Sequence, residues 1–229
     1  MRIVFITILS IIVQLAPAQD TAYLSRVKTA LQQKWPANRT INLVFHGHSV
    51  PSGYFNTPNV RTLDAYPQLV LQALKQKYPY AVVNVITTAI GGENSSSGAK
   101  RFKKEVLPHR PDVLFIDYAL NDRRLGLAQT EKNWRKMIRW ALKKKIPVIL
   151  LTPSPDISVE WTKTDNELAR LTALIVRLAN EYGIGLADSY SAFINEVNQG
   201  RNIKEYMSQS NHPNRKGHEL IAAAILQYF

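Results

Sequence analysis

Four separate blocks of the sequence contain residues that could together cleave an ester. Ser49 lies in the first block, Gly92 ends an Ile-Gly-Gly turn in the second, and Asn121 and His212 lie in the third and fourth. A hydroxyl nucleophile, an imidazole base, and hydrogen-bond donors from a glycine turn and an amide are the groups that acyl transfer requires. These residue types predict a serine-dependent acyl-transfer site, provided that the fold brings the four blocks together.

Five short apolar runs predict the strands that would position these blocks. They cover residues 41–45, 81–86, 113–118, 147–151 and 184–187. Longer amphipathic segments lie between them and predict helices. The first helix is expected to run from Leu24 to Trp35, with Pro36 ending it. This alternation of strands and helices predicts an α/β fold, with one parallel sheet covered by helices on both faces.

The order of the blocks along the chain predicts where they meet. In a parallel sheet of this kind, ligands bind beyond the carboxyl ends of the strands. The blocks with Ser49, Gly92 and Asn121 follow the first three predicted strands, and His212 precedes the last predicted helix, at residues 220–225. We therefore expect all four residues to converge on one edge of the sheet.

The four blocks resemble those of the SGNH/GDSL-type hydrolases, an esterase- and lipase-like family. Gly47-His48-Ser49 resembles the family's Gly-Asp-Ser block, and Ile90-Gly91-Gly92 resembles its second, glycine-containing block. Ala119-Leu120-Asn121-Asp122 resembles Gly-x-Asn-Asp, and Gln209-x-x-His212-Pro213-Asn214 resembles Asp-x-x-His-Pro-Asn. The order and approximate spacing of the blocks match the family from about residue 41 to residue 229.

The resemblance implies a fold and a role for each residue. The fold would be a three-layer α/β/α, flavodoxin-like arrangement with a five-stranded parallel sheet. Ser49 would be the nucleophile and His212 the base. The oxyanion hole would consist of the backbone N–H groups of Ser49 and Gly92 and the side-chain amide of Asn121. No cofactor and no metal are expected.

Three positions depart from the family pattern. His48 replaces the aspartate before the nucleophile, and Ala119 replaces the first glycine of the third block. More consequential is Gln209, which stands where the family has the aspartate that orients the histidine. In Ser-His-Asp proteases, replacing that aspartate with an amide lowers kcat by about 10⁴. We interpret the site as a Ser-His dyad, with Gln209 as the candidate orienter of the imidazole.

Other orienters and other roles stay open at this point. Asp188, Glu205 or a backbone carbonyl could approach the imidazole instead of Gln209. Each site residue also has a structural alternative: a helix cap for Ser49, a turn glycine, an Asx-turn asparagine or a packed histidine. The His46-x-His48 pair invites a metal site, but no third histidine and no carboxylate pair lies near it in the sequence.

The function that follows is a serine ester hydrolase acting through an acyl-serine intermediate. Family resemblance implies short acyl groups, and we rank the removal of acetyl groups from carbohydrate first, because no long apolar stretch could serve as a lipid-binding lid. The alternatives are a non-catalytic glycan-binding relative, in which the missing aspartate has cost the activity, and an O-acyltransferase or lipase of the same fold.

The first residues predict export. Met1-Arg2 is followed by an apolar run that ends at Ala16-Pro17-Ala18, the small-x-small pattern of a signal-peptidase site. We therefore predict a signal peptide over residues 1–18, a single SGNH-hydrolase-like domain over residues 19–229, and a periplasmic or secreted location. A buried N-terminal strand is the alternative.

The composition limits the partners. The chain has 229 residues and no cysteine, which excludes disulfides, cysteine nucleophiles and thiolate metal sites. Its 29 Lys and Arg against 17 Asp and Glu give a net charge of +12, which favours anionic polysaccharides or envelope surfaces on electrostatic grounds. No nucleic-acid motif accompanies the basic residues, and no stable membrane insertion is expected. The expected partner is a small-molecule or polysaccharide ester, and an anionic one fits the charge.

Overall fold

The computed structural model describes residues 22–229, and it contains a five-stranded parallel sheet in the order β2-β1-β3-β4-β5. The strands are β1 (Thr40–Gly47), β2 (Val82–Thr87), β3 (Val113–Asp117), β4 (Val148–Leu151) and β5 (Gly185–Ala187). The predicted α/β fold, with its three layers and flavodoxin-like strand order, is confirmed. The signal peptide predicted for residues 1–18 lies outside the described residues.

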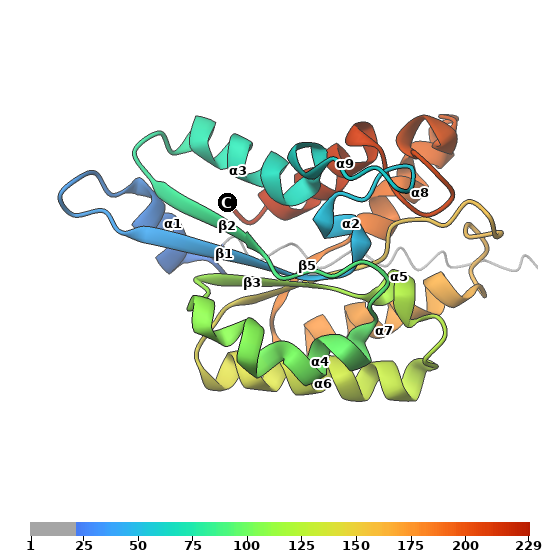
Figure 1. Cartoon of the computed structure of the whole chain (residues 1–229), viewed down its shortest axis with the longest axis horizontal. Coiled ribbons are helices and arrows are strands. Elements are labelled where there is room, and N and C mark those ends of the chain that lie inside the picture. Colours follow the sequence, from blue (N-terminus) through green and yellow to red (C-terminus); the bar gives the residue numbers. More distant parts are fainter. Residues whose placement is uncertain (1–21) are drawn as a thin grey trace, which may run out of the picture.

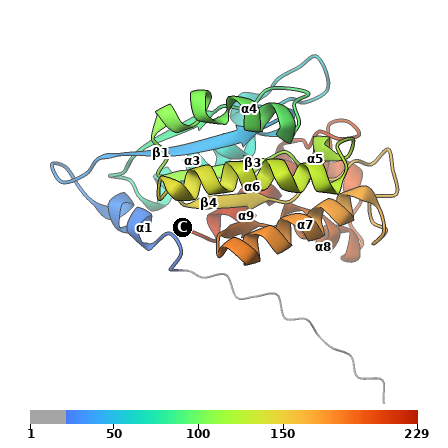
Figure 2. The same ribbon diagram turned by 90° about the horizontal axis from the view of Figure 1, so that it is seen from below.

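Helices cover both faces of the sheet (Figure 1). One layer contains α1 (Ser25–Gln32), α3 (Tyr66–Lys77), α8 (Ser189–Asn198) and α9 (Arg215–Leu226). The other contains α4 (Ser95–Glu105), α6 (Leu127–Lys143) and α7 (Glu167–Tyr182). Figure 2 shows this second layer from outside, with α6 between α4 and α7. Among the described residues, no helix is long and apolar enough to cross a membrane.

The central strands β3 and β4 are apolar at almost every position and lie in the core between these layers. All five residues of β3 are buried, as expected for a central strand with both faces covered. Successive residues pack against opposite layers: Phe45 belongs to the core under α3 and α9, whereas Val44 belongs to the core over α4 and α6. Phe45 stacks on Phe115 with ring centroids 4.2 Å apart.

Two helical segments differ from the sequence expectation. α1 ends at Gln32, and Trp35 is 84% exposed, so the expected end of this helix at Trp35 was wrong. The residue before a proline disfavours helical backbone, which explains why the helix stops short of Trp35. Helix α8 had no predicted counterpart; it begins after Asp188, whose side chain accepts a hydrogen bond from the Ser191 N–H.

The connections at the carboxyl ends of the strands carry the predicted site. β1 leads directly into the short helix α2 (Ser49–Ser52), and β3 leads into α5 (Ala119–Asp122). The loop after β2 contains the glycine turn and ends where α4 begins, and the segment before α9 contains His212. All four predicted blocks therefore meet at one sheet edge, on the right in Figure 1.

Candidate active site

Ser49 occupies the first turn of α2, immediately after β1. Gly47 makes this sharp exit possible, because a Cβ there would lie 2.5 Å from the carbonyl oxygen of Asp117 and 2.9 Å from the Pro51 ring. Gly53 ends the helix with a φ of +86°, in the left-handed region that favours glycine. The result is a serine held on rigid backbone at the edge of the sheet.

His212 lies within hydrogen-bond distance of this serine. Its Nε2 is 2.9 Å from the Ser49 Oγ, and both side chains are largely buried. The backbone around His212 is fixed, because its carbonyl accepts hydrogen bonds from the N–H and the hydroxyl of Ser208. Asn214 then caps α9 by accepting from the Gly217 N–H. The imidazole is thus presented to Ser49 by a tight loop anchored on a helix.

A backbone carbonyl orients the other side of the imidazole. The Nδ1 of His212 is 3.0 Å from the carbonyl oxygen of Phe55, which lies in the loop after α2. This loop is braced by hydrogen bonds from the Phe55 N–H to the Asn59 carbonyl and from the Arg61 N–H to the Gly53 carbonyl. A carbonyl can only accept, so it favours the neutral tautomer with the proton on Nδ1 and a free lone pair on Nε2 facing Ser49.

Gln209 also contacts His212, but with its amide nitrogen. The Gln209 Nε2 is 2.8 Å from His212 Nδ1, while its Oε1 accepts a hydrogen bond of 3.0 Å from the Thr57 N–H. A flipped amide would place its NH₂ against the Thr57 donor, so the Thr57 contact selects the observed orientation. Gln209 therefore opposes Phe55: its N–H favours the tautomer in which Nδ1 is unprotonated.

The two carboxylates considered as alternative orienters lie elsewhere. Asp188 caps α8 and accepts a hydrogen bond of 2.8 Å from Thr152. Glu205 forms an ion pair of 3.0 Å with Lys216 on the surface. Of the options left open by the sequence, the backbone carbonyl of Phe55 is the acceptor that the structure places against the imidazole.

The surroundings keep His212 neutral. Burial lowers the pKa of its imidazole, and although the Phe55 carbonyl raises it, the net pKa lies below the ordinary 6.5. The neighbouring His48 also lowers it. A neutral imidazole is the form that can accept a proton from a serine hydroxyl.

The oxyanion-hole candidates lie in the connections that follow β1, β2 and β3, at the same edge of the sheet as Ser49. The Gly92 backbone has a φ of +78°, and within residues 22–229 neither its N–H nor that of Ser49 has an acceptor. The Asn121 amide donates one hydrogen bond of 2.7 Å to the Glu93 carbonyl, which leaves its second N–H available. This contact joins the third block to the glycine turn of the second.

A polar network next to the Gly91-Gly92 turn holds Glu93, the residue that follows the turn. Arg101 donates to the Glu93 carboxylate at 2.8 Å and to the Tyr118 hydroxyl at 3.1 Å. His46 lies next to the same hydroxyl, and its Nδ1 is 2.9 Å from the Thr88 Oγ1. Burial lowers the pKa of His46 to about 3, so it stays neutral and has a structural role in this network.

His48 and Asp122 also have partners within the fold. The His48 Nδ1 accepts from the Val50 N–H at 3.2 Å, and its Nε2 is 3.3 Å from Asp117. Asp122 accepts hydrogen bonds of 2.7 Å from the Ser95 N–H and from the Trp134 indole. His48 therefore caps α2, and Asp122 ties α5 to α4 and α6.

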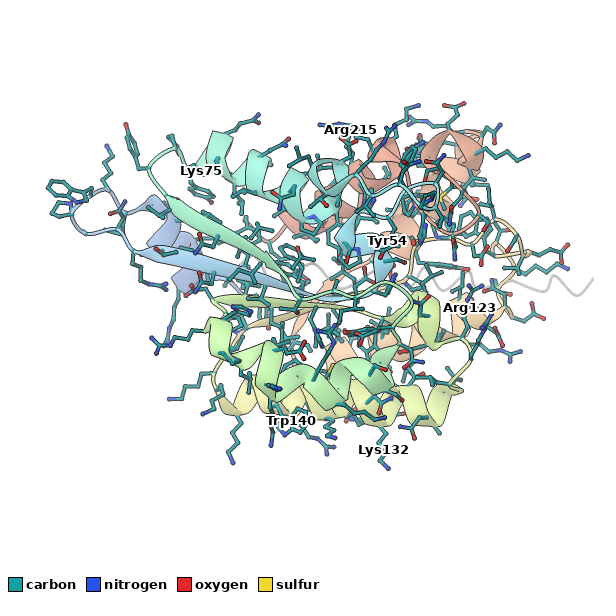
Figure 3. All side chains as sticks on the ribbon, viewed as in Figure 1. Tyr54, Lys75, Arg123, Lys132, Trp140 and Arg215 are labelled. Carbon is teal, nitrogen blue, oxygen red and sulfur yellow. The ribbon has the colours of Figure 1, made fainter. Side chains whose placement is uncertain are left out.

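Two contacts at this end of the molecule had no signal in the sequence. The ring of Tyr54 lies with its centroid 6.0 Å from that of His212 and fills the space beside Gly91. Arg123 forms an ion pair of 2.8 Å with Asp156, from the loop after β4. Figure 3 labels Tyr54 and Arg123, which lie at the same end of the molecule. Both are held by groups distant in the sequence, which explains why no local pattern indicates them.

This site holds a buried serine–imidazole pair with a backbone acceptor behind the imidazole. The connections at the same sheet edge carry backbone and amide donors. Such an arrangement can remove a proton from a hydroxyl and stabilise a nearby oxyanion. Within the described residues, no group of three or more His, Asp and Glu side chains is arranged to hold a metal ion.

The sequence matches the GDSL-like Lipase/Acylhydrolase family over residues 45–220. The chain belongs to this family, and the predicted resemblance is confirmed. No curated protein matches the chain in sequence.

Solved structures of esterases share the fold. A two-domain esterase, CEX, active on acetylated mannans, is similar with a TM-score of 0.74 and 24% identity, covering 92% of this chain and 53% of that one. The chain thus spans about half the length of that esterase. Axe2, an acetylxylan esterase from Geobacillus stearothermophilus, has a TM-score of 0.69 and 21% identity over 82% of this chain and 93% of its own. The acetyl xylan esterase AlAXEase has a TM-score of 0.68 and 23% identity, covering 81% and 98%.

Proposed function

We propose that this protein is an exported serine ester hydrolase that removes acetyl groups from a polysaccharide. The observation that carries the proposal is the contact of 2.9 Å between His212 Nε2 and Ser49 Oγ, with Nδ1 facing the Phe55 carbonyl. Neutral imidazole in this tautomer is the base that a serine nucleophile needs.

In the first half of the reaction, the Ser49 Oγ attacks the ester carbonyl carbon and its proton passes to His212 Nε2. The carbonyl oxygen becomes an oxyanion, which accepts hydrogen bonds from the N–H groups of Ser49 and Gly92 and from Asn121. His212 then returns the proton to the departing sugar oxygen, and an acetyl-serine remains.

In the second half, water replaces the sugar. His212 accepts a proton from water as the water oxygen attacks the acetyl-serine carbonyl, and the same donors stabilise the second oxyanion. The Ser49 oxygen takes back the proton as acetate leaves. The imidazolium forms twice per cycle, and Phe55 offers it a neutral acceptor rather than the charged one of an Asp-containing triad.

The carbohydrate substrate is supported by two observations. Three structures with the same fold are described as esterases of acetylated mannan or xylan, and the Axe2 versions with a serine or a histidine replaced by alanine are described as catalytic mutants. A groove of about 310 Å³ also lies beside the His212 loop, lined by Gln209, Ser208, Ser210 and Ser158 among others. Ile157 and Met207 also line this groove, and hydroxyl and amide groups next to apolar side chains suit sugar rings.

Acetate release from acetylated mannan and acetylated xylan by wild type and Ser49→Ala tests the proposal. We expect release by wild type and none above background by Ser49→Ala. Equal rates would remove Ser49 from the mechanism. Failure of wild type to release acetate while it still binds the polysaccharide would favour a glycan-binding relative. Export is tested by sequencing the N-terminus of protein from its native host, where a start at Gln19 is expected.

A further inference from the structure

The excess positive charge of the protein is concentrated on one face. Residues 100–110 and 132–145 contain twelve of the 29 Lys and Arg residues but one of the 17 acidic residues. The remaining 17 cations and 16 acids nearly balance, so these two segments account for almost all of the net charge of +12. They lie on α4, on α6 and in the turns that follow these helices, which pack side by side (Figure 2).

Most of these cations have no acidic partner. Ten of them are exposed and, within residues 22–229, form no ion pair; we call them the basic face. They are Lys100, Lys103, Lys104, Arg110, Lys132, Lys136, Arg139, Lys143, Lys144 and Lys145. The nearby Glu105 is already paired with Arg101. Uncompensated like charges repel one another, which an anionic ligand would relieve.

A groove runs through the basic face at the end of the sheet opposite Ser49. It has a volume of about 540 Å³, with cations from Lys103, Arg110 and Lys144 and an apolar floor from Leu107, Pro111 and Ile146. Pro111 and Ile146 precede β3 and β4, so the groove is separated from the catalytic edge by roughly the 16 Å length of a five-residue strand. It is therefore a separate site.

The backbone supports a role for the cations. The two non-glycine residues with positive φ among the described residues are Arg110, at +48°, and Lys145, at +59°. Both follow the last turn of a helical segment, a position that glycine occupies with less strain. At both positions the chain carries a cation instead, and Arg110 lines the groove.

The face does not have the features of a membrane-inserting surface. None of the large exposed apolar side chains lies in its two segments. Trp140 lies on the α4 and α6 layer (Figure 3), where its ring stacks on Phe102 and lies beneath the ammonium groups of Lys103 and Lys136, at 4.5 and 4.8 Å. A ring covered in this way cannot insert into lipid.

We propose that this groove and the basic face bind an acidic polysaccharide, with its carboxylates on Lys103, Arg110 and Lys144 and its sugar rings on the apolar floor. The choice of a polysaccharide rests on the proposed function; binding to the groove does not require catalysis. Retention of a polymer at this end would raise the local concentration of ester groups at the Ser49 end.

Binding of polygalacturonate, measured by calorimetry at 20 mM and 500 mM NaCl, tests the proposal. The triple variant Lys103→Gln/Arg110→Gln/Lys144→Gln removes the groove cations. The control variant Arg26→Gln/Lys34→Gln/Lys163→Gln removes the same charge from exposed positions elsewhere. We expect wild type and control to bind at low salt, the groove variant to bind about tenfold or more weakly, and high salt to abolish binding.

Three results would overturn the proposal. The first is equal weakening by both triple variants, which would mean that net charge alone determines binding. The second is absence of wild-type binding at 20 mM NaCl. The third is tighter binding to phosphatidylglycerol vesicles or to duplex DNA than to polygalacturonate. Turnover of a chromogenic acetate ester is measured on every variant and should equal that of wild type. If wild type does not turn over the ester, that result counts against the proposed esterase function and not against binding to the groove.

Discussion

Replacing Gln209 with glutamate should raise the activity. Glutamate has the length of glutamine, so one carboxylate oxygen can keep the hydrogen bond from the Thr57 N–H, now 3.0 Å long. The other oxygen then replaces the amide nitrogen 2.8 Å from His212 Nδ1. The amide N–H of Gln209 favours the tautomer in which His212 Nδ1 is unprotonated. The carboxylate oxygen that replaces it accepts the Nδ1 proton and favours the other tautomer. The family's own residue, aspartate, is one methylene shorter and cannot keep both contacts.

The size of the effect follows from the charge that forms on His212. An imidazolium and a carboxylate about 4 Å apart attract by about 4 kcal/mol at an effective dielectric constant near 20. Desolvation of the new carboxylate offsets about half of this. A net gain of about 2 kcal/mol in the transition state corresponds to roughly 30-fold in kcat.

The assay is the pH dependence of kcat/KM on a chromogenic acetate ester. The carboxylate should raise the pKa of His212 by about 1 to 3 units, so the acidic limb of the profile should move upward while the plateau rises. Gln199→Glu adds the same charge at an exposed position and serves as the matched control. Gln209→Met keeps the length without charge and separates charge from removal of the amide.

A folded Gln209→Glu variant whose kcat/KM plateau is equal to or below that of wild type would contradict this prediction. An acidic limb that does not move would also contradict the prediction, as would an equal rise of the plateau in Gln199→Glu or Gln209→Met.

Three further predictions concern the base, the oxyanion hole and the core. Because burial lowers the pKa of His212, the acidic limb of the wild-type kcat/KM profile should have its midpoint below pH 6.5. Activity is lost there because His212 becomes protonated, and a midpoint above pH 6.5 would contradict this prediction. Asn121→Ala should lower kcat by about 10²–10³ with little change in KM, and a loss below about threefold would exclude it as an oxyanion donor. Gly98→Ala should lower the free energy of unfolding by about 1–3 kcal/mol in urea titrations, because the added Cβ would collide with the Tyr118 ring. Ser97→Ala is the neighbouring control, and a Gly98→Ala variant as stable as wild type would contradict the described packing.

The strands and the convergence of the four blocks could be predicted from the sequence. Short apolar runs mark strands that are buried on both faces, and the five predicted runs match the observed strands to within about one or two residues. The convergence follows from topology, because residues that leave parallel strands at their carboxyl ends meet at one edge. Trp35 was misplaced because helical spacing alone does not show where a following proline stops a helix.

The partner of His212 Nδ1 could not be predicted from residue types. The acceptor is the main-chain oxygen of Phe55, and every residue carries such an oxygen. The orientation of the Gln209 amide depends in turn on the Thr57 N–H, 152 residues away in the chain. The Arg123–Asp156 ion pair likewise joins two loops that no local pattern connects.

The proposed mechanism requires Ser49 to be an activated nucleophile, and stoichiometric labelling with a fluorophosphonate ester measures this property. An activated serine attacks the phosphorus and releases fluoride, and peptide mass spectrometry locates the modified residue. We predict one label per chain, on Ser49, with esterase activity falling in proportion to labelling, and no label on Ser49→Ala or on His212→Ala. Full activity in protein completely labelled at Ser49, or inactivation with the label on another residue, would contradict the account.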